Sequence, residues 1–295
     1  MNQITSITQI NQPITYNTEQ VKAPPTRLAS ALETAKKVAC FALSIFSDLI
    51  LGLCALGLVL FALCYKSNFD PSADQVKTDK PPILMIHGNG SNEMQWVVGR
   101  QFLSGDKYGS VFTLNLDGLL TNEDTKGIDD YAIKVNQKID EIKKLTGRTD
   151  VTLIGHSMGG LIASYYAENL SKSSNTQVDR VITISSPWHG SPLLRRVTKI
   201  TETHLPSLFK DPKRYQQMNN ANGFLDTLRD QALESEQKKI RRYYSIYSDA
   251  DMLVFGKSGS LPASHTKSYS YLGHFSPMIF PPVWNQIQNW LAVEA

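Results

Sequence analysis

The sequence predicts an α/β fold in which helices cover both faces of a mostly parallel central sheet. Short apolar runs such as Ile83–Ile86 are typical of strands buried on both faces of a parallel sheet. Segments with apolar residues at helical spacing separate these runs, and a parallel sheet requires this alternation. The glycine-rich stretch Gly155–Gly160 lies between such a run and a helical segment, and marks a sharp strand-to-helix turn. We therefore expect one large domain over residues 83–295.

The first 82 residues differ from this domain in composition. We expect residues 1–37 to form a polar tail followed by a pre-membrane helix. The tail has no regularly spaced apolar residues, and a helical pattern begins at Arg27. Residues 38–65 are apolar apart from two serines and Asp48, and the 17 residues from Leu49 to Tyr65 approach the minimum length of a membrane span. We expect this segment to anchor the protein to a membrane, as a helix or a hairpin, with residues 66–82 as a polar linker.

Other interpretations of the apolar segment stay open. It could be a buried core helix of the main domain, or a hairpin that lies in the membrane interface around Asp48. A secretory signal peptide is disfavoured, because the apolar run begins after 37 residues and is too long for a signal core. Lysine and arginine residues stand on both sides of the segment in similar numbers, so the charges hardly favour one orientation in a membrane.

Helical and strand patterns alternate through the main domain to its end. Ser91 can cap a helix that runs to about Leu103, and Gly147 is expected to close a helix whose apolar face begins at Ile128. Residues 193–242 contain no strand pattern, which predicts an inserted helical cap. Further strands are expected over residues 110–116, 151–154, 180–184, 243–247 and 267–272, and a last helix is expected over about residues 283–291.

The turn at residues 155–159 has the pattern Gly-x-Ser-x-Gly. In a nucleophile elbow of this kind the serine, here Ser157, sits on a strained turn with its hydroxyl projecting above the sheet. The flanking glycines are needed because a Cβ there would collide with the neighbouring strand or helix. A serine hydroxyl is a poor nucleophile at neutral pH, so Ser157 needs a base and a group that orients the base.

Candidates for these two partners follow from the order serine, acid, histidine along the chain. His265 and His274 both come late enough to be the base, and His274 is favoured because it stands just past the end of a predicted strand. Asp249 and Asp251 both follow the strand expected over residues 243–247. The residues alone do not separate these two acids, because an aspartate just past a strand is commonly a turn former.

Four stretches together resemble the minimal bacterial triacylglycerol lipases of the α/β-hydrolase superfamily; they are His87-Gly88-Asn89-Gly90, Gly155-His156-Ser157-Met158-Gly159-Gly160, Tyr247-Ser248-Asp249-Ala250-Asp251-Met252 and Gly273-His274. The resemblance implies an α/β-hydrolase fold with a Ser157–Asp251–His274 triad. It also implies an oxyanion hole formed by the backbone N–H groups of Asn89 and Met158. Asn89 departs from the apolar residue common at its position, which affects the shape of the acyl pocket more than the backbone donor.

The insertion over residues 193–242 is longer than the smallest lipases of this kind carry. We expect a lid over the acyl site, with helical decoration as the alternative. Its apolar stripe Leu225, Leu228 and Ala232 predicts a helix that covers the site in water.

The expected function is that of a membrane-tethered serine hydrolase that cleaves acyl esters, with a lipid or another acyl ester as substrate. Acyl transfer through the same acyl-enzyme and a non-catalytic binding module on the same fold are the alternatives. No cofactor or metal is expected, because no zinc-protease helix or phosphate-binding glycine loop occurs in the sequence. A net charge of +3 gives no indication of nucleic-acid binding. All three cysteines lie in the apolar segment, so the main domain can form no internal disulfide.

Overall fold

The computed structural model describes residues 32–40, 42–46, 48–49, 70–116, 126–193, 195, 213–261 and 265–293. The chain divides into two compact units, Met1–Lys36 and Lys37–Ala295. In the second unit the described strands form one sheet in the order β2-β1-β3-β4-β5-β6, in which every neighbouring pair is parallel. The strands are β1 (Ile83–Ile86), β2 (Val111–Leu114), β3 (Asp150–His156), β4 (Gln177–Ile184), β5 (Arg242–Ser248) and β6 (His265–Tyr269).

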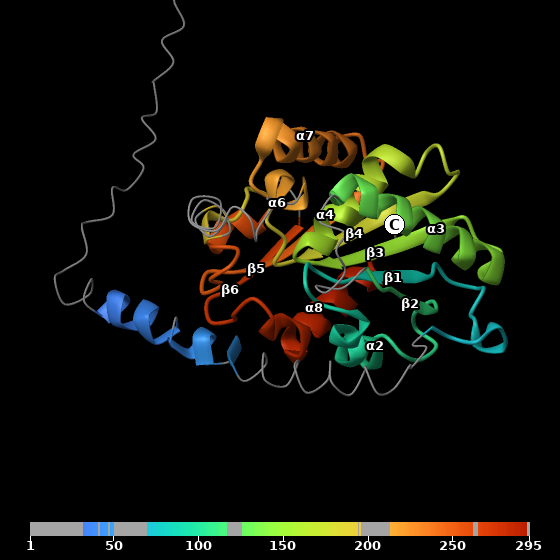
Figure 1. Cartoon of the computed structure of the whole chain (residues 1–295). Coiled ribbons are helices and arrows are strands. Elements are labelled where there is room, and N and C mark those ends of the chain that lie inside the picture. The colour runs from blue at the N-terminus through green and yellow to red at the C-terminus, as the bar shows by residue number, and fades with distance from the viewer. Residues whose placement is uncertain are drawn as a thin grey trace, which may run out of the picture. The chain divides into compact units, whose positions relative to one another are not determined.

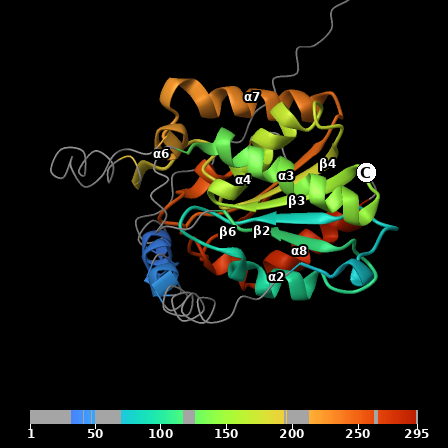
Figure 2. The same ribbon diagram turned by 45° about the vertical axis from the view of Figure 1, so that its right-hand side comes forward.

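Helices cover both faces of this sheet, as the sequence predicts. Alternate residues of β1 point to opposite faces, so Leu84 and Ile86 join one apolar core and Ile83 and Met85 join the other. The first core lies under α3 (Ile128–Thr146), α4 (Met158–Tyr165) and α7 (Phe224–Gln237), and the second lies under α2 (Val97–Phe102) and α8 (Pro281–Ala292). Figures 1 and 2 show these two helical layers on either side of the strands.

Helix boundaries follow local capping, and one of them differs from the expectation. The helix after β1 starts as a 3-10 turn, Glu93–Trp96, and its cap is Asn92, whose Oδ1 accepts the Met94 N–H at 2.9 Å. Ser91 is not the cap, because its hydroxyl donates instead to Gln95 Oε1 at 2.7 Å. The predicted end of α3 is confirmed at Gly147, whose φ of +69° is the left-handed conformation that a glycine adopts without strain.

The last strand lies earlier in the chain than the sequence predicts. It runs over His265–Tyr269, not over residues 267–272, and pairs in register with Tyr244–Ser248. This strand is at the edge of the sheet and most of it is exposed, so it carries no apolar run that would mark it in the sequence. His265, the alternative candidate for the base, is the first residue of β6.

The insertion contributes α6 (Lys213–Met218) and α7 to the described structure. Its expected apolar stripe exists, but Leu225, Leu228 and Ala232 are buried in the same core as α3 and α4. The stripe therefore packs α7 into the helical layer and does not cover a site. Residues 194 and 196–212 of the expected lid lie outside the described residues.

Most of the predicted membrane anchor also lies outside the described residues, which resume at Asp70. Within the described part, residues 38–40, 42–46 and 48–49 are helical. No helix among the described residues combines the length and the apolar character that crossing a bilayer requires. The described part of the expected linker contacts β2 and the residue before it, since Asp70 Oδ1 accepts the Thr113 N–H at 2.9 Å and the Lys77 N–H donates to Ser110 Oγ at 2.7 Å.

Candidate active site

Ser157 stands alone between β3 and α4, at the carboxyl end of the sheet. Its φ of +54° is rare for a residue with a side chain and shows the strain expected of a nucleophile elbow. A Cβ at Gly159 would collide with the carbonyl oxygens of Ile86 and His87, so glycine is required where α4 crosses β1. The turn thus projects the Ser157 hydroxyl beyond the strand ends, where parallel sheets commonly bind ligands.

Three of the predicted side chains form a continuous hydrogen-bonded chain. His274 Nε2 lies 3.0 Å from Ser157 Oγ, and His274 Nδ1 lies 2.8 Å from Asp251 Oδ2. The other carboxylate oxygen, Asp251 Oδ1, accepts the backbone N–H groups of Leu253 and Val254 at 2.9 and 2.8 Å. Asp251 is 1% exposed and fully engaged, whereas Asp249 is exposed at the surface of the turn. The geometry therefore separates the two aspartates that the sequence alone left open.

His156 packs against the ring of His274 and binds its backbone. The two rings lie 4.9 Å apart, and His156 Nε2 lies 3.0 Å from the carbonyl oxygen of His274. Because a carbonyl only accepts, the proton of His156 must be on Nε2. Burial, and after it the neighbouring His274, lower the pKa of His156 to about 3, so this ring stays neutral. A neutral donor of this kind fixes the loop of His274 without adding a positive charge beside it.

Asp48, from the expected membrane anchor, also binds the loop that carries His274. Its carboxylate accepts the backbone N–H groups of His274 at 2.6 Å and of Phe275 at 3.2 Å. The preceding residue, Gly273, leaves room for this approach, because a Cβ there would collide with the Asp48 carboxylate. Burial raises the pKa of Asp48, although the two N–H donors act against this shift. Nothing local in the sequence connects Asp48 with His274, because they are 226 residues apart.

The loop after β1 lies against Ser157. A Cβ at Gly88 would come within 2.8 Å of the Ser157 Cβ, so Gly88 allows close contact between the loop and the elbow. His87 is buried, its Nδ1 lies 2.8 Å from the Gly88 carbonyl oxygen, and its Nε2 accepts the Leu116 N–H at 2.8 Å. Burial lowers the pKa of His87, in keeping with a neutral ring that links the loop to the end of β2.

The two predicted oxyanion donors lie on either side of this contact. Asn89 follows Gly88 in the loop, and Met158 is the first residue of α4, so the Met158 N–H has no acceptor within its own helix. The amino end of α4 adds the favourable field of the helix dipole for a negative charge beside Ser157.

A cavity of about 110 Å³ opens at Ser157 and is lined largely by apolar side chains and the loop after β1. Its lining residues are Gly88, Asn89, His156, Ser157, Pro187, Ser191, Tyr215, Met218, Leu253, Val254, His274 and Phe275. Tyr215 and Met218 come from α6, so the insertion forms one wall of the cavity. No residue of α7 is in this lining.

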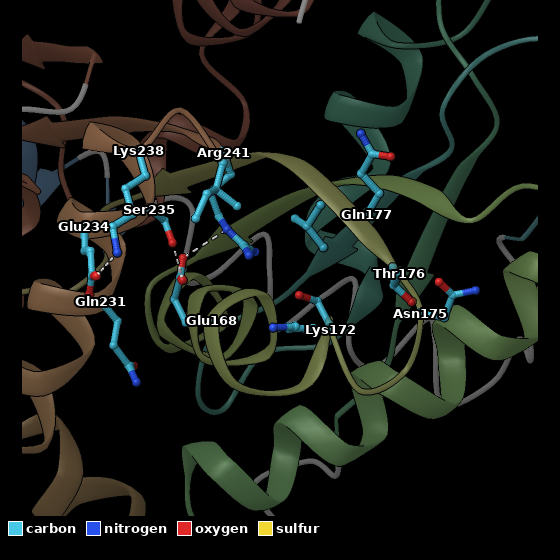
Figure 3. A pocket seen from close by; sticks show the side chains of 13 residues that line it. Glu168, Lys172, Asn175, Thr176, Gln177, Gln231, Glu234, Ser235, Lys238 and Arg241 are labelled. Atoms are coloured by element: carbon cyan, nitrogen blue, oxygen red, sulfur yellow. Dashed lines mark hydrogen bonds and ion pairs between the residues drawn. The ribbon is translucent and has the colours of Figure 1, made fainter.

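Two larger cavities, of about 560 and 570 Å³, lie away from Ser157. The first, drawn in Figure 3, has Gln177 and Arg241 in its lining and so lies at the amino ends of β4 and β5. Ser157 follows β3 and lies at the carboxyl end of this parallel sheet. Its buried carboxylate, Glu168, accepts hydrogen bonds from Ser235 at 2.6 Å and Tyr243 at 2.5 Å and pairs with Arg241 at 3.2 Å. These groups bind one another between α7 and the sheet, which indicates a structural network. The larger volume of this cavity therefore does not identify it as the reaction site.

Comparison with known proteins agrees with this arrangement. A family model described as the alpha/beta hydrolase fold matches residues 81–275. The chain belongs to the α/β-hydrolase family. The resemblance found in the sequence is thereby confirmed, and all four of the stretches that carry it lie within the matched residues.

Individual relatives of this α/β-hydrolase are distant. Triacylglycerol lipases of Burkholderia plantarii and Pseudarthrobacter phenanthrenivorans are each 26% identical to it, over 137 and 136 residues. These matches cover 45% and 44% of this chain but 36% and 40% of the lipases, so the chain matches less than half the length of either relative.

Solved structures extend the likeness in fold. The mature form of a Bacillus licheniformis lipase superposes with a TM-score of 0.60 at 19% identity, covering 76% of this α/β-hydrolase and 97% of the lipase. A monoacylglycerol lipase of Paleococcus ferrophilus superposes with a TM-score of 0.51 at 14% identity, covering 72% and 95% of the two chains. At such identities the likeness shows the fold alone.

In this α/β-hydrolase the structure brings Ser157, Asp251 and His274 together, with Met158 and Asn89 beside them. The alternative histidine, His265, is on the edge strand, where its ring stacks on Tyr244 at 5.1 Å. Sequence reasoning missed three residues near the site, which are Asp48, Arg214 and Tyr215. The last two contact Asn89, whose departure from the usual apolar residue was the available signal.

Proposed function

We propose that this protein is a serine hydrolase that cleaves carboxylic acyl esters, with Ser157 as nucleophile, His274 as general base and Asp251 as the acid of the triad. The observation that carries the proposal is the hydrogen-bonded chain from Asp251 through His274 to Ser157, on a strained elbow of an α/β-hydrolase. The lipase names of the relatives support an ester substrate.

In the proposed first step, His274 Nε2 removes the proton of Ser157 as Oγ attacks the ester carbonyl carbon. Asp251 Oδ2 accepts a hydrogen bond from the His274 Nδ1–H, which keeps that proton on Nδ1, leaves Nε2 free to act as base and stabilises the positive imidazolium that forms. The imidazolium then protonates the leaving alcohol, and an acyl group remains on Ser157. Water activated by His274 hydrolyses this acyl-enzyme and restores the serine.

The negative oxygen of the tetrahedral intermediate would be bound by the N–H groups of Asn89 and Met158. Preformed donors aimed at this oxygen are commonly the largest electrostatic contribution, and removal of one costs about 3 kcal/mol. The amino end of α4 favours the same charge.

Lipid esters are the proposed substrates, with the protein tethered to a membrane by residues 38–65. The cavity at Ser157 has Leu253, Val254 and Phe275 in its lining, which suits an acyl chain. Beside Asp48, the side chains of Leu43 and Leu49 are 54% and 61% exposed, as expected of residues that meet lipid.

Replacement of the nucleophile tests the proposal. Ser157→Ala should abolish both hydrolysis of a short soluble ester and labelling by a fluorophosphonate, with little change in Tm, because the lost hydroxyl projects from the turn. Ser173→Ala is the matched control, since Ser173 is an exposed serine whose hydroxyl donates to the Leu170 carbonyl oxygen. Wild-type turnover in Ser157→Ala, or no labelling of the wild-type protein, would contradict the proposed function.

A further inference from the structure

The side chain of Asn89 links the proposed oxyanion loop to the insertion. Its Nδ2 donates to the Tyr215 hydroxyl at 3.1 Å, and its Oδ1 accepts from Arg214 Nε at 3.0 Å. Both partners are consecutive residues of α6, more than 120 positions further along the chain. An apolar residue at position 89 could make neither bond, so the asparagine fits a helix that offers one donor and one acceptor side by side.

Helix α6 is itself fastened on its other side to the start of α3. Gln217 Oε1 accepts the Ile128 N–H at 2.6 Å, and Gln217 Nε2 donates to Asp129 Oδ1 at 2.8 Å. Lys213 Nζ pairs with Asp129 at 2.6 Å and with Asp130 at 2.9 Å. Burial raises the pKa of Asp129, but the bonds from Lys213 and Gln217 outweigh it and leave the pKa below its usual value. These contacts favour the charged carboxylate and hold α6 in one position.

The loop that α6 holds is the one whose position matters most for the proposed chemistry. Gly88 packs directly on Ser157, and Asn89 provides the next backbone N–H. A donor acts on a developing oxyanion only when it is held near hydrogen-bond distance of that oxygen before the reaction. A small rotation of the Gly88–Asn89 segment would turn this N–H away and leave the side chains of Ser157 and His274 in place.

We propose that Arg214 and Tyr215 are positioning residues that fix the Asn89 side chain, so that its backbone N–H faces the reacting oxygen. In this role α6 connects the start of α3 to the Gly88–Asn89 loop and keeps a fixed position, and it is not a lid that moves over the site. The inference rests on the proposed hydrolase function, because the oxyanion exists only in that reaction.

The test compares kcat and KM on a short soluble ester for Arg214→Met, Tyr215→Phe and Asn89→Ala, with the active serines counted by exhaustive fluorophosphonate labelling. We expect each variant to lose about tenfold in kcat per active site with KM within about twofold, because a misplaced donor costs less than the hundredfold or more of a deleted one. The double variant Asn89→Ala/Arg214→Met should be no slower than Asn89→Ala alone, since both changes break one link. Tyr215→Phe keeps the ring that lines the cavity, so it tests the hydroxyl alone.

A second measurement separates positioning from a loss of packing. A trifluoromethyl ketone forms a tetrahedral adduct that needs the oxyanion donors, so its affinity should fall in proportion to kcat in the three variants. The matched control is Arg148→Met, which removes an arginine paired with Asp150 at the opposite end of the sheet and should leave kcat unchanged. Wild-type kcat and inhibitor affinity in Arg214→Met and Tyr215→Phe would overturn the inference, as would a double variant much slower than either single one. An inactive, unlabelled wild type would instead refute the proposed function.

Discussion

Asp251 and Asp249 show how two neighbouring residues of one type take different roles. Asp251 is buried and each of its oxygens accepts a hydrogen bond, while Asp249 is exposed and its backbone N–H continues the pairing with β6 through the Tyr269 carbonyl oxygen. Because Asp251 Oδ2 lies 2.8 Å from His274 Nδ1, this carboxylate is the one that can hold the His274 ring in one tautomer.

Asp251→Asn is therefore expected to lower kcat by about four orders of magnitude, the effect of the corresponding change in other triads. The new amide would donate to His274 Nδ1 and move the ring proton to Nε2, where it blocks the base. Asp249→Asn, the matched control, should stay within a few-fold of the wild type. Steady-state kinetics on a short ester measures both variants, and the reverse order of effects would assign the acid to Asp249.

How far single residues could be predicted depends on how local their signal is. Ser157 follows from the elbow pattern. Chain order left His265 and His274, and the position of His274 just past a predicted strand favoured it, so the signals for both residues are local. Asp251 was separated from Asp249 only by resemblance, since burial is a tertiary property. Asp48 and Arg214 could not be found, because their contacts join distant parts of the chain and have no local pattern.

Among the elements, α7 differs most from its predicted role. Its apolar stripe was expected to cover the site, yet it packs on the sheet beside α3 and α4. An apolar stripe fixes which face of a helix is buried but not what it is buried against, so periodicity could predict the helix and not its partner. The strands were predicted more accurately than the packing of α7, because continuous apolar runs occur where a strand is covered on both faces. The exposed edge strand β6, which has no such run, was the exception.

The end of α7 carries a carboxyl group that should make stability depend on pH. Glu236 Oε2 is buried without a hydrogen-bond partner among the described residues, while the backbone N–H of Tyr243 donates to the group. Burial raises the pKa of Glu236 to about 7, against 4.5 for the ordinary side chain. A raised pKa means that the folded state favours the protonated form, so this contribution to stability is full below pH 4.5 and is lost as the pH rises through 7.

Glu236→Gln should consequently unfold like the wild type at pH 4 and raise the Tm at pH 8.5 by roughly 2 to 4 °C, which is about 1 kcal/mol for a protein of this size. The expected gain in stability is smaller than the free energy that corresponds to the full pKa shift, because Glu236 is partly exposed and solvent screens its charge. Glu234→Gln is the control, since Glu234 is exposed and pairs with Lys238. Thermal unfolding followed by circular dichroism across this pH range measures the difference, and an equal gain at both pH values would exclude titration of Glu236 as its cause.

On the scale of the whole molecule, the proposed membrane anchor would have two separable effects on the proposed reaction. Residues 38–65 would concentrate the enzyme at a bilayer, which raises the local concentration of lipid esters without altering the chemistry. Asp48, within the same segment, binds the backbone of His274 and Phe275, which should affect the chemistry on any ester. A variant that removes the whole segment loses both effects, so a soluble substrate is needed to tell them apart.

Asp48→Asn in the full chain should lower kcat on a short soluble ester by about tenfold, because the amide offers one acceptor where the carboxylate offers two, and a lost charged hydrogen bond costs about 1.5 to 3 kcal/mol. Removal of residues 1–36 keeps Asp48 and should leave this activity unchanged. Removal of residues 1–65 should reproduce the Asp48→Asn loss on the soluble ester and add a further, steeper loss on phospholipid or acylglycerol vesicles. Full activity on the soluble ester after removal of residues 1–65 would show that Asp48 does not position His274. An equal loss on soluble ester and vesicles would instead assign the segment to the catalytic loop alone and remove the membrane from the proposed function.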